Sequence, residues 1–302
     1  MTPNNLRLAF LLQVHKNPEQ LYKFIRQITA NKNSDVYIHI DRKSIDKFSS
    51  RIPTGPHIKI IDESIHIKWG DISQVDATMC LLRNLKKTHK KYDFVFLRSG
   101  QDLMVKSGLE DFLARNCEKV FMNSKKVESP YTYFWNIKWP AFARNQYDSV
   151  FHPNRIIRAA LITLYKLGIN ILPNPHTLPI DVYRGSSWFC IPGEAASYIV
   201  DFVENNPWFY KAFENALAPD EYFFQTIIMS SPYALKNACD NLTHLRFGIS
   251  RQDNNHAVTF SIKDVPEIEN SGKFFARKFD QDIDNEVIEY FCRKCKAEVT
   301  NN

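Results

Sequence analysis

Short apolar runs alternate with helical patterns at the start of the chain. Residues 8–14 are almost wholly apolar, which is typical of a buried strand. Apolar residues at helical spacing follow at 19–29, and a second apolar run occupies 35–41. Asn17 is suited to cap the intervening helix and Pro18 to begin it. A strand, a helix and a strand in this order predict a parallel sheet with crossover helices.

The same patterns continue through most of the chain. Further strands are predicted at residues 58–61, 65–67, 94–97, 120–122 and 188–191. Further helices are predicted at residues 74–86, 109–114, 194–204, 219–229 and 285–296. Residues 128–179 are rich in aromatic residues, Pro and Asn, with one basic helical stretch at 155–166. We interpret 128–179 as a mobile or substrate-facing insertion. With no internal repeat and no clear boundary, the chain is predicted to form a single α/β domain.

Composition narrows the class of protein only slightly. The 302 residues are 44% hydrophobic, which is enough to build a sizeable core. The net charge is +6, from 39 basic and 33 acidic residues. A charge of this size is compatible with an anionic small ligand, an anionic membrane surface or nucleic acid, and indicates none of them by itself.

Cysteine spacing and hydropathy favour a cytoplasmic protein. No apolar run is long enough to span a membrane, and no pattern of a cleaved signal peptide follows the N-terminus. Of the six cysteines only Cys292 and Cys295 lie close together, and no second pair of ligands completes a zinc site beside them. This usage predicts a reducing compartment.

Two carboxylates stand where the helix at 219–229 is predicted to begin. Pro219 precedes Asp220 and Glu221, and aromatic residues follow. Proline at the first helical position and acids in the first turn are ordinary features of a helix start. A carboxylate at the rim of an aromatic cleft is also suited to act as a general base on a sugar hydroxyl. Both interpretations remain open on these residues alone.

Polar residues follow the predicted strands at the ends where ligands bind in open α/β sheets. These positions hold His15, Asp41 and residues 99–102. Asp41 is suited to accept hydrogen bonds from a ribose or a base, and equally suited to cap a turn. The Gly-x-Gly-x-x-Gly fingerprint is absent after the first strand, which argues against a dinucleotide-binding enzyme.

A bound diphosphate would need a positive partner. Many enzymes that use nucleotide-diphosphate sugars hold a divalent cation with Asp-x-Asp, but residues 99–102 contain a single acid. Asp280 and Asp282 have the right spacing, and we interpret them as an acidic helix start. Arg277 and Lys278, flanked by phenylalanines, could bind and neutralise phosphate instead. Alternatively, they form an ordinary basic pair on the surface.

Seven segments in order resemble glycosyltransferase family 14, the core-2/I-branching β-1,6-N-acetylglucosaminyltransferases and their protein xylosyltransferase relatives. The segments are residues 14–21, 37–44, 68–77, 97–102, 185–189, 219–226 and 275–280. The resemblance covers nearly the whole chain and implies a GT-A fold with a mixed, mostly parallel sheet flanked by helices. It also implies one domain over residues 1–302, with a nucleotide-binding half at 1–123 and an acceptor-binding and catalytic half at 124–302.

The resemblance implies roles for individual residues. Glu221 matches the catalytic base, and Lys278 matches a lysine that holds the diphosphate in place of a metal. The implied nucleotide and diphosphate contacts also include Val14, His15, Asp41, Arg246 and Arg277. The implied contacts to the acceptor or the donor sugar are Gln101, Asp102, Ser187, Trp188 and Asp220. The acceptor is expected to lie against residues 124–183, which align least.

The expected reaction is an inverting transfer of a sugar, GlcNAc, from a UDP-sugar to a hydroxyl of a glycan or lipid-linked glycan, with no metal or other cofactor. Family members from animals carry a membrane anchor, a stem and disulfides; the absence of these features here resembles a bacterial, cytoplasmic member. The basic helix at 155–166 would suit peripheral contact with the cytoplasmic face of the inner membrane. Nucleic acid is not an expected partner, because the basic residues form no tract interleaved with aromatics. The alternatives are a UDP-xylose-dependent transferase of the same fold and a non-catalytic glycan-binding protein.

Overall fold

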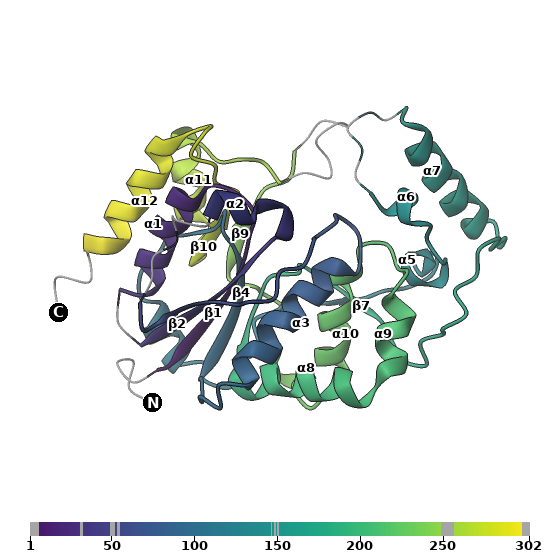
Figure 1. Ribbon diagram of the computed structural model, residues 1–302, viewed down its shortest axis with the longest axis horizontal. Coiled ribbons are helices and arrows are strands. Elements are labelled where there is room, and N and C mark those ends of the chain that lie inside the picture. Colours follow the sequence, from purple (N-terminus) through teal and green to yellow (C-terminus); the bar gives the residue numbers. More distant parts are fainter. Residues whose placement is uncertain are drawn as a thin grey trace.

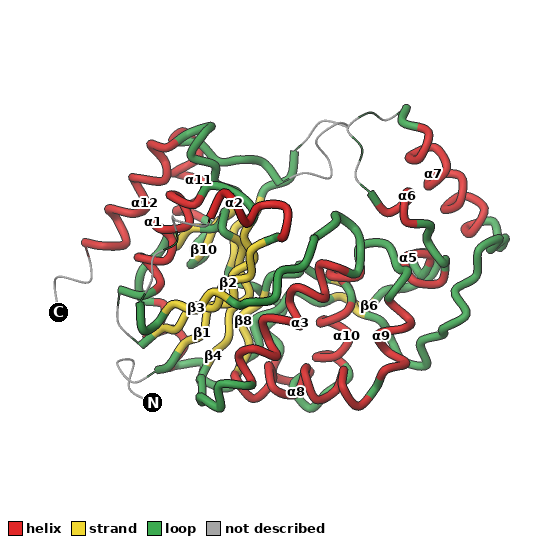
Figure 2. The backbone as a smooth tube through the Cα atoms, in the orientation of Figure 1, coloured by secondary structure: helices red, strands yellow, loops and turns green. Residues whose placement is uncertain are grey.

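Helices lie on both faces of a central sheet (Figures 1 and 2). The computed structural model describes residues 6–30, 33–48, 52, 55–145, 147, 149, 151–248 and 257–297. The sheet has five strands in the order β3-β2-β1-β4-β8. They are β1 (Leu8–Val14), β2 (Ser34–Ile40), β3 (Ile58–Ile60), β4 (Phe94–Ser99) and β8 (Phe189–Pro192). All neighbours are parallel except β8, which runs antiparallel to β4. The predicted mixed, mostly parallel sheet flanked by helices is confirmed.

Strand β1 is buried along its whole length because it has a helical layer on each face. Leu8, Phe10 and Leu12 belong to the core on one face, and Ala9 and Leu11 belong to the core on the other. The first core contains α1 (Pro18–Ile28) and α12 (Asn285–Ala297), and the second contains α3 (Ser73–Lys86), α8 (Gly193–Asn205) and α10 (Phe223–Met229). Successive side chains of a strand point to opposite faces, so a strand covered on both is apolar at nearly every position. The exception is Gln13, which is buried and donates a hydrogen bond to the hydroxyl of Thr78 at 2.8 Å.

The remaining elements are short and surround this framework. A second sheet has the order β5-β10-β9, built from β5 (Leu103–Met104), β9 (Thr243–Leu245) and β10 (Phe275–Arg277), and β6 (Lys125–Lys126) pairs with β7 (Tyr183–Arg184). The other helices are α2 (Ile45–Phe48), α4 (Leu109–Ala114), α5 (Tyr133–Asn136), α6 (Ala141–Arg144), α7 (Pro153–Lys166), α9 (Pro207–Phe213) and α11 (Val265–Asn270). Single 3₁₀ turns are η2 (Arg42–Ser44), η3 (Pro219–Glu221), η4 (Ala234–Lys236) and η5 (Ile262–Asp264).

Several sequence predictions about local structure are wrong. Residues 65–67 form no strand, and residues 120–122 form only isolated bridges. The helix predicted at 219–229 is broken at Tyr222, which separates η3 from α10. Asn17 occupies the predicted N-cap position of α1, but its side chain makes no capping bond: its backbone is left-handed, with φ 56°, and its side-chain amide donates to Asp280 Oδ1 at 2.7 Å. Tertiary contacts override the local preference in each of these places.

The end of the chain returns to the first strands. Phe275 of β10 packs edge-on against the ring of Phe10, and α12 contacts α1. Beyond β10, the carbonyl of Phe279 accepts hydrogen bonds from the side chains of Gln20 and Gln101, at 3.1 and 3.2 Å. Residues 275–280 are thereby held at the carboxyl end of β1. The edge of the sheet where ligands are expected is therefore built from both predicted halves of the chain.

The predicted insertion at 128–179 contains three helices, α5, α6 and α7, with a small core of their own. The buried members of that core are Tyr133, Ile137, Trp139, Ala143, Leu161 and Leu217. In Figure 1, α7 (teal) lies at the edge of the molecule, apart from the central sheet. None of the helices in the described ranges is both long and apolar enough to cross a membrane.

Gly70 joins the turn before α3 to the turn that holds η3. Its carbonyl accepts a hydrogen bond from the amide of Ala218 at 3.0 Å. Its backbone is left-handed, with φ +70°, and a Cβ atom added there would lie 2.4 Å from the carbonyl oxygen of Arg144. Only glycine fits, because a side chain would meet both backbone strain and a backbone atom that cannot turn aside.

We predict that Gly70→Ala destabilises the protein more than Gly168→Ala. Gly168 is also left-handed, with φ +85°, but has open space around its missing Cβ. Gly168→Ala should cost about 1–2 kcal/mol from backbone strain alone. Gly70→Ala should cost a further ~1–3 kcal/mol because the backbone must shift. Urea unfolding followed by circular dichroism measures both, and equal losses in the two variants would contradict the contact.

Candidate active site

The two adjacent carboxylates are held by a short 3₁₀ turn. Ala218 adopts a left-handed conformation with φ 51°, and Pro219 then begins η3. Tyr222 follows with its ring buried against Phe134 and Trp135. The turn is therefore anchored by buried neighbours at both ends, while the Glu221 side chain keeps 36% of its surface exposed.

Glu221 is held by an arginine from strand β7. Nε and Nη2 of Arg184 both donate to Glu221 Oε2, at 2.9 and 2.6 Å. The guanidinium of Arg184 also lies over the rings of Phe134 and Tyr222, which fixes its plane. Glu221 Oε1 accepts no hydrogen bond from any residue that the structure describes. One carboxylate oxygen is thus oriented by Arg184 and the other is available to accept a proton.

Asp220 has a different environment from its neighbour. Its Oδ2 accepts a hydrogen bond from the hydroxyl of Ser187 at 2.6 Å. Burial and, to a smaller extent, the negative charge of Glu221 raise the pKa of Asp220 to about 6, against the opposing effect of the hydrogen bond from Ser187. Two neighbouring carboxylates in unlike surroundings can take different roles in proton transfer. The side chain of Glu221 is partly exposed, whereas that of Asp220 is enclosed, so Glu221 is the carboxylate that can reach a substrate.

Trp188 connects the carboxylates to the basic residues after β10. The guanidinium of Arg277 lies 4.2 Å from the centre of the Trp188 ring. Its Nε lies 3.4 Å from Oδ1 of Asp102, which is completely buried. Burial raises the pKa of Asp102 and lowers that of Arg277, and each of the two charges opposes the shift of the other. Arg277 therefore links the end of β4, through Asp102, to the loop that carries Ser187, through Trp188.

Positive side chains surround His15 at the carboxyl end of β1. Desolvation and the nearby charges of Lys16, Lys278 and Lys43 lower the pKa of His15 to about 4. Lys16 pairs with Asp280, and Lys43 lies 3.2 Å from an oxygen of Asp41. We call these four residues, His15, Lys16, Lys43 and Lys278, the cationic cluster.

Lys278 is the member of the cationic cluster whose charge is left unpaired. No carboxylate or hydrogen-bond partner contacts its ammonium group within the described part of the chain. Desolvation, followed by the charges of Lys16 and Arg277, lowers its pKa, and Asp280 opposes this. A cation that lacks a protein partner in a positive environment is favourable for binding an anion such as a phosphate.

Three other residues that the sequence predicted to contact a ligand make contacts within the protein. Asp41 caps η2 and accepts a hydrogen bond from the amide of Lys43 at 3.2 Å. Val14 is the last residue of β1, and its side chain lies against Gly100, where an added Cβ atom would be 3.1 Å from Val14 Cγ1. Gln101 is buried and supports residues 275–280 through the carbonyl of Phe279.

Arg246 lies outside the group of unpaired charges. Its guanidinium pairs with Asp264 at 2.8 Å, also pairs with Glu267, and stacks on Phe260. Two carboxylates already neutralise it, so it is less suited than Lys278 to bind a diphosphate. Asp102, being fully buried, is likewise placed to position Arg277 and not to contact a sugar.

Sequence reasoning missed Arg184, Lys16 and Lys43. The two lysines follow the ends of β1 and β2 directly, so a search of strand ends for basic residues could have found them. Arg184 lies 37 residues from Glu221, and nothing in the spacing joins the two.

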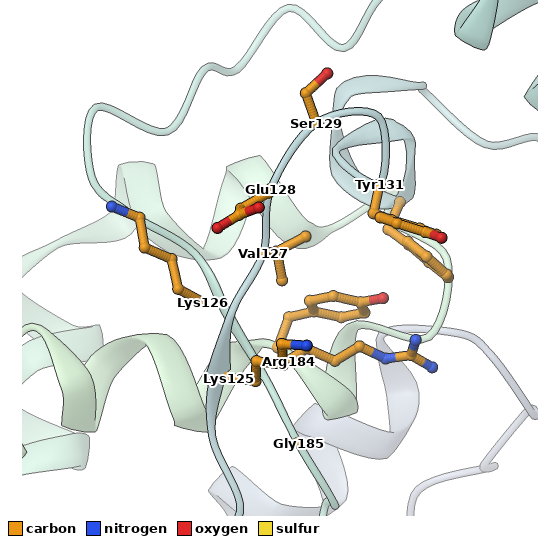
Figure 3. A pocket seen from close by; sticks show the side chains of 10 residues that line it. Lys125, Lys126, Val127, Glu128, Ser129, Tyr131, Arg184 and Gly185 are labelled. Carbon is orange, nitrogen blue, oxygen red and sulfur yellow. The ribbon is translucent and has the colours of Figure 1, made fainter.

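A cavity of about 560 Å³ opens beside Arg184 (Figure 3). Its wall combines the β6–β7 ribbon with aromatic rings; the lining residues are Lys125, Lys126, Val127, Glu128, Ser129, Tyr131, Phe134, Arg184, Gly185 and Tyr222. Since Arg184 contacts Glu221, the cavity adjoins the carboxylates. Aromatic faces together with charged groups are suited to hold a sugar ring.

The family model for the Core-2/I-Branching enzyme matches residues 8–269. The chain belongs to the Core-2/I-branching enzyme family. This match spans the sheet, the carboxylates and the cavity. The match agrees with the resemblance seen in the sequence.

Three relatives from animals are similar over nearly the whole chain. Rat xylosyltransferase 1 is 24% identical over 95% of this chain and 35% of its own length. Mouse beta-1,3-galactosyl-O-glycosyl-glycoprotein beta-1,6-N-acetylglucosaminyltransferase 4 is 25% identical over 96% of this chain and 65% of its own length. A xylosyltransferase of Ciona intestinalis is 22% identical over 94% of this chain and 34% of its own length. The chain thus spans about a third of the xylosyltransferases and 65% of the mouse protein.

We predict that Asp220 makes stability depend on pH. Its pKa is raised from an ordinary 3.8 to about 6, so between these values the folded protein binds more protons than the unfolded chain. The free energy of unfolding should therefore fall as the pH rises through this window. Asp220→Asn removes the effect and should gain up to about 3 kcal/mol relative to the wild type between pH 4 and pH 7.

Urea unfolding at several pH values measures this difference. Ser187→Ala is the matched variant: it removes the hydrogen bond that opposes the shift, so its stability should fall more steeply with pH than that of the wild type. A difference between wild type and Asp220→Asn that stays constant with pH would contradict this account.

Proposed function

We propose that this chain transfers GlcNAc from UDP-GlcNAc to a hydroxyl of a glycan acceptor, with inversion at the anomeric carbon. The observation that carries the proposal is a chain of neighbouring residues that joins two carboxylates to two basic side chains. Glu221 and Asp220 connect through Ser187 and Trp188 to Arg277, and so to the unpaired Lys278. A transfer from a nucleotide-diphosphate sugar needs a base at one end of such a chain of residues and a cation at the other.

The donor diphosphate binds at the cationic cluster. Lys278 neutralises the phosphate that becomes the leaving group, with Lys16 and Lys43 adding positive potential. The ring of His15 is neutral at physiological pH, since its pKa is lowered to about 4, and it offers a hydrogen-bond donor and an acceptor to the nucleotide. Val14 and Asp41 complete the nucleotide side at the ends of β1 and β2. In this proposal no metal is required.

The reaction is a single in-line displacement. Glu221 Oε1 takes the proton of the acceptor hydroxyl, and that oxygen forms a bond to the anomeric carbon of the donor. The bond from the anomeric carbon to the phosphate oxygen breaks, and its electron pair leaves with UDP. Lys278 stabilises the negative charge that develops there. An α-linked donor thus gives a β-glycoside.

The acceptor occupies the cavity beside Arg184. Arg184 holds Glu221 through Oε2, which turns Oε1 toward a bound hydroxyl, and Tyr131 and Phe134 provide ring faces for the sugar. Ser187 and Asp220 support the position of Glu221, with no contact to substrate required of them. Asp102 and Arg277 are assigned a positioning role for Lys278.

UDP-xylose is the second candidate donor, because xylosyltransferases are as similar to this chain as the mouse GlcNAc-transferase. The family model that matches residues 8–269 is that of the Core-2/I-Branching enzyme, which favours GlcNAc. A panel of UDP-sugars tested for hydrolysis separates the two donors. A non-catalytic glycan-binding protein would hydrolyse neither.

We predict that Glu221→Gln lowers turnover by about 10²–10⁴-fold while UDP binding is kept, because the amide cannot take the acceptor proton. Single-turnover transfer from UDP-GlcNAc and calorimetric titration with UDP measure the two properties. Glu118→Gln removes a carboxylate at the exposed ion pair with Lys236 and serves as the control. Turnover near the wild-type rate in Glu221→Gln would remove Glu221 from its role as the base.

We predict that Lys278→Met lowers turnover by about 10²–10³-fold and weakens UDP binding, because the charge on the leaving phosphate is no longer neutralised. Lys273→Met is the matched control, since Lys273 precedes β10 and is paired with Asp240 at 2.6 Å. EDTA should leave wild-type activity unchanged. Complete loss of activity with EDTA, restored by Mn²⁺, would overturn the role given to Lys278.

A further inference from the structure

Helix α7 turns uncharged side chains to solvent. Ile156, Ala160, Thr163 and Leu167 are spaced three or four residues apart, so they lie along one face of the helix, and all four are exposed. Leu161 is the one residue of α7 that is buried, in the core shared with α5 and α6. A surface helix ordinarily buries its apolar stripe and exposes its charges. The outer face of α7 has the opposite character.

Large apolar side chains around this face are among the most exposed of the molecule. Phe151 is 83% exposed, Leu167 is 71% exposed and Ile156 is 55% exposed. Ile157 on α7, and Ile169 and Ile171 in the loop that follows, are exposed as well. We call these six residues the α7 surface. Soluble proteins rarely leave so many apolar side chains of one helix and its flanks in water, and such patches mark sites of interaction.

The charge of the same segment has one sign. Residues 149–180 contain no aspartate or glutamate, and their charged residues are Arg155, Arg158 and Lys166. Arg155 and Lys166 flank the apolar stripe on one side, as helical spacing places them. Exposed apolar residues accompanied by basic residues are the pattern of helices that lie in the interface of an anionic membrane.

We propose that the α7 surface docks on an anionic lipid membrane, with α7 lying in the plane of the headgroups. Phe151, Ile156 and Leu167 enter the boundary between headgroups and acyl chains, and the basic residues contact lipid phosphates. A second copy of this chain is a poorer occupant, because a symmetric contact would bring Arg155 and Lys166 of one copy toward the same two residues of the other. Anionic lipid supplies the complementary charge.

The face of α7 opposite the exposed stripe lies toward the cavity beside Arg184. The hydroxyl of Tyr165 on α7 lies 2.8 Å from the hydroxyl of Thr132, and the ammonium of Lys166 lies 5.8 Å from the centre of the Tyr131 ring, which lines the cavity. A protein docked through α7 therefore holds this cavity about one helix diameter, ~10 Å, from the membrane. Resting on the proposed function, this position selects an acceptor class: glycans linked to a lipid carrier.

Vesicle flotation tests the docking with the full chain. Vesicles of phosphatidylcholine with about 30 mol% phosphatidylglycerol should bind the wild type. Vesicles of phosphatidylcholine alone should bind it at least about tenfold more weakly. The double variant Ile156→Glu, Leu167→Glu should lose about tenfold or more of the binding to anionic vesicles. Leu235→Glu is the matched control, because Leu235 is 99% exposed on η4, outside the α7 surface, and its variant should bind as the wild type does.

Two results would overturn the proposal. One is equal binding of anionic vesicles by the double variant and the wild type. The other is a wild-type dimer in light scattering that the double variant dissociates, because a second copy would then cover this face. Hydrolysis of UDP-GlcNAc in the absence of vesicles tests the proposed function separately and should be the same in wild type and double variant. Vesicle binding without hydrolysis would leave the docking in place and remove the proposed function.

Discussion

The buried pair formed by Arg277 and Asp102 is the contact on which the candidate active site depends. Asp102 has no exposed surface, and the arginine that faces it also stacks on Trp188. Removing one member of such a pair leaves an uncompensated buried charge, which is strongly destabilising. The pair therefore joins three segments distant in sequence: the end of β4, the loop before β8 and the end of β10. Lys278 is the next residue, so its position follows from the pair.

The charged side chains near the Arg277–Asp102 pair fall into two groups, those with an ion-pair partner and those without one among the described residues. Lys16 and Lys43 are balanced by Asp280 and Asp41, whereas Lys278 keeps an unbalanced charge among the described residues. Glu221 and Asp220 divide in a similar way, since one is oriented by Arg184 and partly exposed, and the other is enclosed with Ser187. The paired groups hold the shape of the site and the unpaired ones remain available to a ligand. The same distinction applies to the outer face of α7, where apolar groups lack a partner among the residues that the structure describes.

Much of the framework could be predicted because its signals are local. The apolar runs of β1, β2 and β4 and the periodicity of α1 and α3 indicate their own structure, and the resemblance carried by ordered motifs led to the family that the match over residues 8–269 shows. The break at Tyr222 was missed because its cause is the packing of that ring against Phe134 and Trp135. The diphosphate contact of Arg246 stays a prediction, and the sequence did not indicate its two carboxylate partners, because they come from another turn and helix.

The sequence by itself determined the α/β class, the strands β1, β2 and β4 at the centre of the sheet, and the residue types able to act as base and cation. These follow from short-range periodicity and from chemistry that each side chain carries alone. Only the tertiary structure decided which charges meet. Arg184 reaches Glu221 across 37 residues and Lys16 reaches Asp280 across 264, so no local pattern could reveal either pair. Pairing, burial and exposure are properties of neighbours in space, and they distinguish Lys278 from the other cations and the outer face of α7 from the other helices.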